Sequence, residues 1–355
     1  MLSQPTSAPA SGSRTRGGDK VAVVGQIVDI SAAQQDVSRD FVVGSRAAWQ
    51  DAAARGGLGG RSVQHLTLEV DGSAASLQAA WARLEQDSAC VAVCGCVGHP
   101  ASQALLALQA RSDAKTPLPI VAPWMHQAPT QHPVDAVFDI FATHEAQVLH
   151  ALRGLSSMGV RQFGVAYASA MARQATQDQV LAAAKALQLT VQAVTPESTP
   201  PIVLFVGGTP ELHAFVQQLR LPPGRQCYVV ALADVNLQVF AQLGGVPKSA
   251  SVIATQPVPM TTAGVPIVRA YRETLSRLYD EPPSPQGLAG FIAARYMAEI
   301  LQALPAPWTR SSVLAALQRR APMDLGGYAI SYEGRRRQGA LVTQAMLTAD
   351  ARIVG

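Results

Sequence analysis

The sequence has few charged and few aromatic residues. Charged residues make up 15% of the 355 positions and aromatic residues 5%, whereas charged residues account for roughly 25% of a typical soluble domain. The net charge of +4 is spread along the chain, and the one run of three basic residues is Arg335, Arg336 and Arg337. A nucleic-acid-binding surface needs basic residues clustered with aromatic ones. The composition therefore argues against a nucleic-acid partner.

Long apolar stretches are also absent. No segment approaches the roughly 20 uninterrupted apolar residues that cross a bilayer, so we expect a protein that does not span the membrane. Residues 1–19 form a Ser/Pro/Ala/Gly-rich spacer that is too polar to pack, and we expect it to be disordered. The spacer lacks the apolar stretch of about 7–15 residues found in a secretory signal. We expect either a cytoplasmic protein or one whose signal has been lost, cleaved or left out of the sequence.

Cysteine is scarce, at four residues. Cys90, Cys94 and Cys96 lie in the segment CVAVCGC, and their even spacing places them on one face of a strand. Side chains on one strand face point in parallel, which suits a disulfide poorly. A zinc site with this spacing lacks a nearby fourth ligand. We therefore interpret these cysteines as small buried apolar residues and expect them not to react with thiol reagents in the native protein.

Apolar residues make up 48% of the chain, enough for a large core. They fall in short runs separated by helix-length segments, and residues 21–28 (VAVVGQIV) are continuously apolar, as in a strand covered on both faces. We expect the first helix to begin near Ser38 as its N-cap. Strands that alternate with helices predict βαβ units and a parallel sheet. The predicted strands are residues 21–28, 62–70, 90–98, 118–124, 161–168, 189–194, 201–208, 226–232 and 250–258.

The pattern changes after residue 258. Three helices are predicted at about residues 266–280, 285–303 and 309–320, followed by a hairpin, DLGGYAISY–EGRRRQ–GALVTQAML, close to the C-terminus. Two parallel-sheet units of similar size followed by this closing segment predict an α/β protein with two lobes.

Sequence motifs of enzymes are missing. The chain has no GxGxxG dinucleotide turn, no GxxxxGK[ST] phosphate loop, no GxSxG nucleophile elbow and no HExxH metal motif. No pair of carboxylates marks an acid/base couple. We expect no enzymatic activity, no cofactor and no metal. Four of the histidines are interpreted as surface or groove residues: His126, His132, His144 and His150.

The order of several segments carries a family resemblance. These segments are VAVVGQIVDIS, FVVGSRAAWQDAAARGGLGGRSV, VAVCGCVGHPASQALL with PIVAPW, GVRQFGVAY, ASVIATQPVP, GLAGFIAARYMAEIL and DLGGYAISYEGRRRQGALV. In this order and spacing they resemble the type 1 periplasmic binding proteins, specifically the leucine/isoleucine/valine-binding subunits of ABC transporters. The resemblance covers nearly the whole chain after residue 20.

The resemblance implies two Rossmann-like lobes with parallel central sheets, joined by a three-stranded hinge. Lobe 1 would comprise residues 20–142 plus 255–330, and lobe 2 residues 143–254 plus 331–355. A small ligand would bind between the lobes at the carboxyl ends of the strands and be enclosed by hinge closure. The resemblance also implies a periplasmic location and an ABC permease as partner.

Cleft residues are implied by position in the family pattern. His99 stands near the position where the family has a Ser or Thr hydroxyl, and Ser102 follows it. Trp124 stands where the family has a smaller residue. Asp234 falls where an acid can pair with a ligand ammonium. The full set of implied ligand-binding residues is His99, Ser102, Trp124, Met125, Thr143, Tyr167, Gly208 and Asp234.

Each of these positions has a purely structural alternative. Ser102 can simply satisfy the first turn of a helix, Trp124 can pack the lobe interface, and Asp234 can cap the helix predicted at 235–243. Tyr167 can be ordinary strand-end packing. Because His99 and Trp124 change the family's pocket, we predict weak binding of leucine, isoleucine and valine. We expect better binding of a planar solute with a carboxylate or amide that stacks on Trp124.

Three classes of function follow. The first is a solute-binding protein that captures an amino acid, an amide or a small organic acid for ABC-type import. The second is a ligand sensor or receptor domain of the same fold, without transport. The third, an enzyme on a similar two-lobed frame, would need a set of catalytic residues that the sequence does not show.

Overall fold

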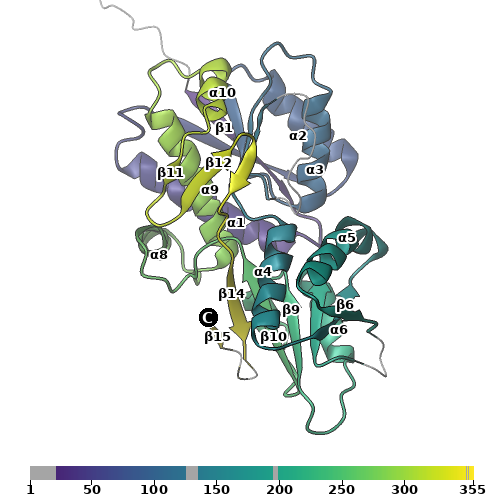
Figure 1. Cartoon of the computed structure of the whole chain (residues 1–355). Coiled ribbons are helices and arrows are strands. Elements are labelled where there is room, and N and C mark those ends of the chain that lie inside the picture. The colour runs from purple at the N-terminus through teal and green to yellow at the C-terminus, as the bar shows by residue number, and fades with distance from the viewer. Residues whose placement is uncertain (1–20, 125–134, 195–198, 349, 351) are drawn as a thin grey trace, which may run out of the picture.

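The computed structural model describes residues 21–124, 135–194, 199–348, 350 and 352–355. The predicted spacer at residues 1–19 lies outside these residues. Figure 1 shows two α/β lobes, one above the other, with the N-terminal part of the chain in the upper lobe. The predicted fold class, two lobes with central parallel sheets, is confirmed.

The upper lobe, lobe 1, is built on a five-stranded parallel sheet in the order β2-β1-β3-β4-β5. Alternate residues of β1 enter two separate cores: Val24 and Val28 face the core with α1 and α9, while Val23 and Ile27 face the core with α2 and α3. Burial on both faces explains the apolar run, which is interrupted only at Gln26, whose amide donates to Ser45 Oγ and Gly95 O. The strands are β1 (Ala22–Asp29), β2 (Val63–Val70), β3 (Cys90–Cys94), β4 (Ile120–Val121) and β5 (Val137–Phe138).

Helices cover both faces of this sheet, and three of them come from the later part of the chain. The early helices are α1 (Gln35–Ala54), α2 (Ala74–Gln86) and α3 (His99–Ala110). The later helices are α8 (Pro266–Leu278), α9 (Pro285–Gln302) and α10 (Arg310–Gln318). Helix α9 is buried almost throughout, including Phe291, Tyr296 and Met297, which explains its apolar sequence.

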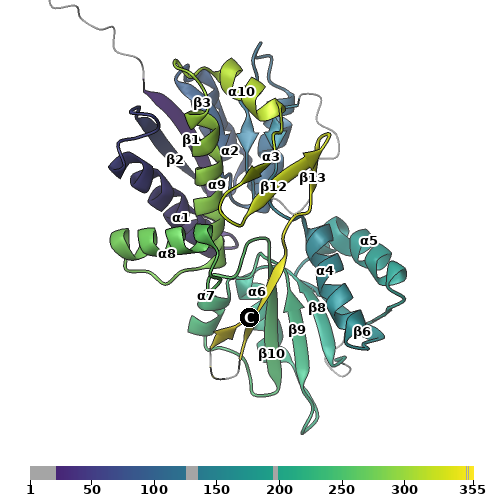
Figure 2. The same ribbon diagram turned by 60° about the vertical axis from the view of Figure 1, so that its left-hand side comes forward.

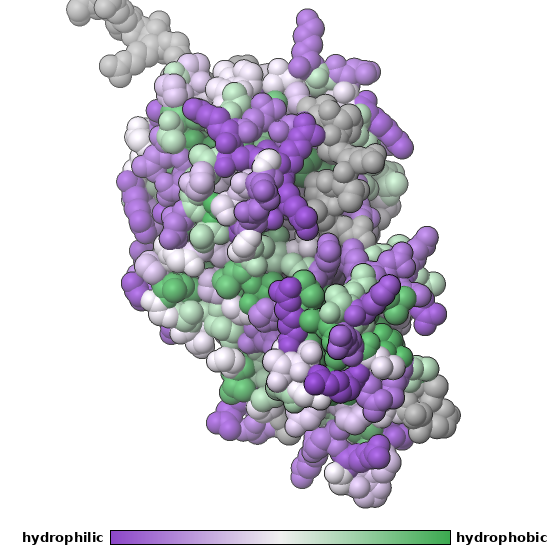
Figure 3. All heavy atoms as spheres, viewed as in Figure 1, coloured by the Kyte–Doolittle hydropathy of each residue, from purple (hydrophilic) through white to green (hydrophobic). Residues whose placement is uncertain are grey.

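The lower lobe, lobe 2, has a seven-stranded sheet in the order β15-β14-β10-β9-β8-β6-β7. Its strands are β6 (Gln162–Tyr167), β7 (Thr190–Gln192), β8 (Ile202–Val206), β9 (Cys227–Ala231), β10 (Ala250–Gln256), β14 (Thr343–Leu347) and β15 (Ile353–Val354). Its helices are α4 (His144–Ser157), α5 (Ala170–Ala186), α6 (Thr209–Gln218) and α7 (Leu237–Gln242). In Figure 3 polar side chains cover most of the face, with apolar ones at the lobe junction and over α4 and α5.

The chain passes between the lobes three times: from β5 to α4, from β10 to α8 and from β13 to β14. The small sheet of β11 (Met323–Asp324), β12 (Ala329–Glu333) and β13 (Arg336–Gln338) lies against these crossings, and Figure 2 shows the chain running from it down into lobe 2. The buried Tyr328 hydroxyl lies 2.7 Å from Ile140 O and 3.2 Å from Pro257 O, so it contacts two crossings at once.

The hairpin strands β12 and β13 contact lobe 1 beyond the boundary expected at residue 331. Tyr332 Oη donates to Asp139 O at 2.8 Å, and Arg337 Nε donates to Ile140 O at 3.2 Å. We therefore propose that the third crossing lies at residues 339–342. Arg337 is half-buried, so the arginine run is only in part a solvated turn.

Two local predictions were wrong. Helix α1 begins at Gln35, and Ser38 lies inside it, where its Oγ donates to Asp29 O at 2.6 Å and does not cap the helix. The segment GALVTQAML does not pair with DLGGYAISY; its strand β14 pairs antiparallel with β10 of lobe 2. The Ser38 hydroxyl thus bonds to the end of the preceding strand β1, whereas β14 pairs with a strand of the other lobe.

All four cysteines are buried, and we predict that none reacts with a thiol reagent at about pH 8 without denaturant. Burial raises the pKa of Cys90 and Cys227 to about 11 and of Cys96 to about 12, and it raises the pKa of Cys94 still further. The thiolate fraction is therefore negligible. Counting modified thiols with and without guanidinium checks the expectation; labelling of two or more native thiols would contradict the burial of β3.

Candidate functional site

A small cavity lies where the carboxyl ends of the two sheets meet. Its volume is about 10 Å³, room for about one water molecule. Trp124 follows β4, Ala233 and Asp234 follow β9, and the remaining residues come from α4 and the crossings. The lining consists of Trp124, Phe141, Ala142, His144, Gln147, Ala233, Asp234 and Pro257.

A buried contact between a histidine and an aspartate lies at this cavity. His144 Nε2 is 2.7 Å from Asp234 Oδ2, with side chains only 2% and 10% exposed. His144 is the first residue of α4, and Thr143 fixes that helix start because its side chain accepts the Ala146 N–H at 3.3 Å. Asp234 does not cap α7; Asn236 does, accepting from Gln238 N at 3.0 Å and Val239 N at 3.3 Å. Asp234 is thus directed at the imidazole.

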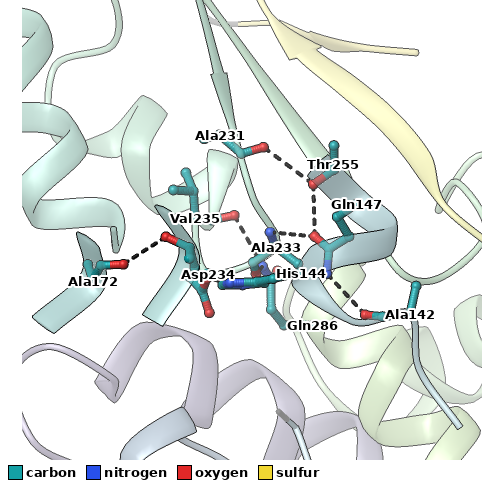
Figure 4. Close-up of polar contacts among 11 residues, drawn as sticks. Ala142, His144, Gln147, Ala172, Ala231, Ala233, Asp234, Val235, Thr255 and Gln286 are labelled. Carbon is teal, nitrogen blue, oxygen red and sulfur yellow. Dashed lines mark hydrogen bonds and ion pairs between the residues drawn. The ribbon is translucent and has the colours of Figure 1, made fainter. Parts of the chain in front are cut away.

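The backbone around Asp234 is held from both lobes, as Figure 4 shows. Gln147 Oε1 accepts from Ala233 N at 3.0 Å and from Thr255 Oγ1 at 2.8 Å, while its Nε2 donates to Ala142 O at 3.1 Å. From lobe 1, Gln286 Nε2 donates to Ala233 O at 3.4 Å and Val235 O at 3.3 Å. The side-chain amides of Gln147 in lobe 2 and Gln286 in lobe 1 thus hold the loop after β9 from both sides of the lobe junction.

Aromatic side chains form the lobe 1 wall of the cavity. Trp124 is 4% exposed and meets the ring of Phe141 edge-on at 5.4 Å and that of Phe41 at 5.8 Å. The indole therefore lines the cavity and also packs into the lobe 1 core. Its alternative role as a packing residue and its predicted role as a ligand contact are compatible here.

Four polar residues connect the lobes beside the cavity, and we term them the α1 latch: Asp36, Asp40, Thr209 and Asn236. Thr209 Oγ1 donates to Asp36 Oδ2 at 2.5 Å, and Asn236 Nδ2 donates to Asp40 Oδ2 at 3.0 Å. Asn236 N donates to Thr209 Oγ1 at 2.9 Å. Burial raises the pKa of both carboxyls, and the charge of Asp234 raises the pKa of Asp36 further.

The remaining predicted site residues do not gather at the cavity. Ser102 is buried in lobe 1 and donates to Cys96 O at 3.2 Å. It does not satisfy the first turn of α3, because no side chain caps the start of that helix. Tyr167 is half-buried under the guanidinium of Arg173, 5.4 Å from its ring centre. Gly208 immediately precedes α6. A Cβ added at Gly208 would lie 3.6 Å from Ala33 O, across the lobe junction. The expected convergence of Ser102 and Tyr167 with Asp234 is therefore not seen.

Two further predicted residues have no described side chain. His99 begins α3, but its side chain lies outside the description, and Met125 lies outside the described residues altogether. The same holds for His126 and His132. The ligand-binding roles of all eight positions stay predictions.

Sequence reasoning missed the residues that make the site polar: His144, Gln147, Gln286 and the α1 latch. His144 was treated as one of several surface or groove histidines. A usable signal existed, because His144 directly follows the cap residue Thr143 at a helix start after a strand end. Among the described residues, no group of three His, Cys, Asp or Glu side chains could hold a metal ion. No described helix combines the length and apolarity needed to cross a membrane.

Comparison with known proteins gives one family. The family described as "Periplasmic binding protein" matches residues 22–351 of the chain. No curated protein matches the sequence.

Solved structures of low sequence identity share the fold. A possible leucine/isoleucine/valine-binding protein from Rhodopirellula baltica superposes with a TM-score of 0.81 at 18% identity, covering 97% of this chain and 98% of that one. A leucine-binding protein from Thermotoga maritima gives 0.77 at 15% identity, covering 94% and 97%. A fatty acid ABC transporter substrate-binding protein from Thermomonospora curvata gives 0.73 at 14% identity, covering 95% and 91%.

Proposed function

Because the chain belongs to the periplasmic binding protein family, we propose that it captures a small polar solute between its lobes for ABC-type import. The observation that carries the proposal is the buried His144–Asp234 pair, which lies at the carboxyl ends of both sheets. Open α/β sheets bind ligands at this edge. Family membership also supports a periplasmic or extracellular location, a permease partner and a role in binding without catalysis.

The cavity must enlarge before it can hold a solute. With a volume of about 10 Å³ it cannot take even the smallest amino acid, since a water molecule alone needs about that space. Entry therefore requires separation of the α1 latch, and the bound state must be wider at Trp124 and His144 than the present structure. This sequence of opening, binding and closure is a hinge motion.

Charge at the cavity favours an amide as the ligand. Three carboxyl groups, Asp36, Asp40 and Asp234, lie at or beside the cavity, and a buried anionic ligand would be repelled by them. Among the described residues that line the cavity, the carboxylate is that of Asp234, and it already contacts His144, so an ammonium ligand would have to displace an internal partner. A planar neutral amide can donate to Asp234 and accept from His144 while contacting Trp124. The solved structures of this fold include a leucine-binding protein and a fatty acid transporter's substrate-binding protein, so the fold accepts ligands of different chemistry.

Calorimetric titration with leucine and with benzamide tests the proposal. We expect benzamide to bind more tightly than leucine and Asp234→Asn to weaken benzamide binding about tenfold or more, because a hydrogen bond to a charged group contributes about 1.5–3 kcal/mol. Asp113→Asn, an exposed lobe 1 position, serves as the control and should leave binding unchanged. Tight leucine binding that survives Trp124→Ala would contradict the proposed site.

A further inference from the structure

A second pocket lies at the end of lobe 1 that faces away from lobe 2. Its volume is about 350 Å³. It is formed by residues that precede three neighbouring parallel strands, β2, β1 and β3, together with the loop between α9 and α10. Figures 1 and 2 place α10 and the start of β1 at the top of the molecule, remote from the lobe junction. The lining residues are Val21, Ala22, Arg61, Ser62, Ser88, Ala89, Ala306, Pro307 and Trp308.

Two buried hydrogen-bond donors in this pocket lack acceptors. Arg61 Nη1 and Trp308 Nε1 are both inaccessible to solvent and have no hydrogen-bond partner in the part of the chain that the structure describes. The Arg61 guanidinium lies over the Trp308 ring, 4.7 Å from its centre. Stacking on an aromatic face is favourable, but it satisfies neither N–H group. Among the described residues no carboxylate forms an ion pair with Arg61; the nearby Asp87 Oδ1 instead accepts the Ala89 N–H at 2.8 Å.

The backbone holds Arg61 in this position. Leu58 N donates to Arg61 O at 2.8 Å and Arg61 N donates to Leu58 O at 3.2 Å, closing a tight turn between α1 and β2. Leu58 is buried in the lobe 1 core, which anchors the turn. The guanidinium is thus placed beside Trp308 by local structure. Both side chains are only half-buried, so a ligand in the pocket reaches Nη1 and Nε1 when these side chains shift.

From these features we propose that the pocket is a second binding site, for a small organic acid with one carboxylate and an apolar body. Guanidinium groups bind carboxylates through paired N–H donors, and the Trp308 N–H adds a further donor. The side chains of Val21, Ala22 and Pro307 provide apolar contact for the rest of the molecule. Nothing in this site depends on the inter-lobe cavity, because it lies at the amino ends of the strands.

Titration of the full chain with benzoate, with inorganic phosphate in parallel, tests this site. We expect benzoate to bind and phosphate to bind at least about tenfold more weakly, since phosphate gains nothing from the apolar wall. Arg61→Gln should weaken benzoate binding about tenfold or more, through loss of charge-assisted hydrogen bonds. Trp308→Phe, which keeps a ring but removes the N–H, should weaken it severalfold. Asp113→Asn, an exposed lobe 1 position outside both pockets, is the control and should leave it unchanged.

Several results would overturn the proposal. Benzoate affinity that is unaffected by both Arg61→Gln and Trp308→Phe would place the ligand elsewhere, and loss of benzoate binding in Asp234→Asn would assign it to the inter-lobe cavity. Equal affinity for phosphate and benzoate would contradict the organic acid. If the parent protein does not bind benzoate, the proposed second site is wrong. Arg61→Lys keeps the charge without the planar fork, so an affinity equal to the parent's would contradict the paired-donor geometry.

Discussion

Gly290→Ala is expected to destabilise the protein by about 2 kcal/mol. Helices α1 and α9 cross with their backbones in contact: a Cβ at Gly290 would lie 1.9 Å from Phe41 O and 3.0 Å from Ser45 N. Overpacking against backbone cannot be relieved by a rotamer change and costs about 3 kcal/mol. The better helix propensity of alanine offsets only about 1 kcal/mol of that, so sterics dominate.

A second glycine makes the same crossing. A Cβ at Gly44 would lie 1.7 Å from Gly287 O, so Gly44→Ala should be destabilising too. The crossing positions the site, because α1 carries Asp36 and Asp40 of the α1 latch while α9 carries Gln286.

The matched control is Gly154→Ala in α4, where an added Cβ meets nothing within 4 Å. That change should stabilise the protein by about 0.5–1 kcal/mol through helix propensity alone. Urea unfolding of the three variants and the parent checks both signs. If Gly290→Ala shifted the unfolding midpoint in the same direction as Gly154→Ala, the close backbone contact between α1 and α9 would be wrong.

Acidification is expected to favour the closed arrangement of the lobes. Burial raises the pKa of Asp36 and Asp40 above the ordinary value of 3.8 in the closed structure. A carboxyl whose pKa is raised on closure binds its proton more tightly in the closed state, so closure is strongest below pH 3.8 and weakens as the pH rises through the raised pKa. Neighbouring charges also act on these two carboxyls. Asp234 raises the pKa of Asp36, and Glu281 raises that of Asp40, whereas Arg39 lowers the pKa of Asp40.

Removing one hydrogen bond of the α1 latch should lower the ratio of closed to open forms of the protein. Thr209→Val leaves the buried Asp36 carboxylate without its hydroxyl donor and the Asn236 N–H without its acceptor. Leaving a buried polar group unsatisfied costs about 1–3 kcal/mol, so the ratio of closed to open forms should fall about tenfold or more. Asp36→Asn removes the charge that burial penalises, so we expect it to weaken the dependence on pH.

Small-angle X-ray scattering between about pH 4 and about pH 7 measures this dependence through the radius of gyration. The parent should become more compact at the acidic end, Asp36→Asn should change less, and Asp113→Asn should behave like the parent. A parent protein that expands on acidification, while remaining folded by circular dichroism, would contradict the assigned direction.

Much of the fold follows from sequence because its strands are buried on both faces. The alternation of Val23 and Val24 between two cores forces a continuously apolar run, and such runs mark most of the sheet strands. Strand β5 was not predicted because it spans only Val137–Phe138, too short to show a pattern. The pairing of β14 with β10 was missed because its partner lies about 90 residues earlier, beyond any local signal.

Site residues could be predicted from the sequence only where they directly follow the end of a strand. Trp124 and Asp234 follow strand ends and do line the cavity, whereas Ser102 turns inward to Cys96 O. The α1 latch joins residues 173 and 196 positions apart in the chain, and no periodicity or motif records such pairs. Hydrogen bonds between the lobes form only when the lobes are closed on each other, so they can be identified only from the tertiary structure.

The central claim, that a solute binds between the lobes and draws them together, is tested most directly by single-molecule fluorescence energy transfer across the junction. Gln103→Cys in α3 and Gln177→Cys in α5 place dyes on exposed positions of the two lobes, and the four native cysteines are buried and should not compete. Because entry requires the lobes to separate, the ligand-free protein must sample an open form of low transfer efficiency. We predict a shift from that form toward high transfer efficiency on addition of benzamide, and a concentration midpoint about tenfold higher or more in Asp234→Asn. Calorimetric binding of benzamide with no change in transfer efficiency, in both the parent and Asp234→Asn, would contradict the account.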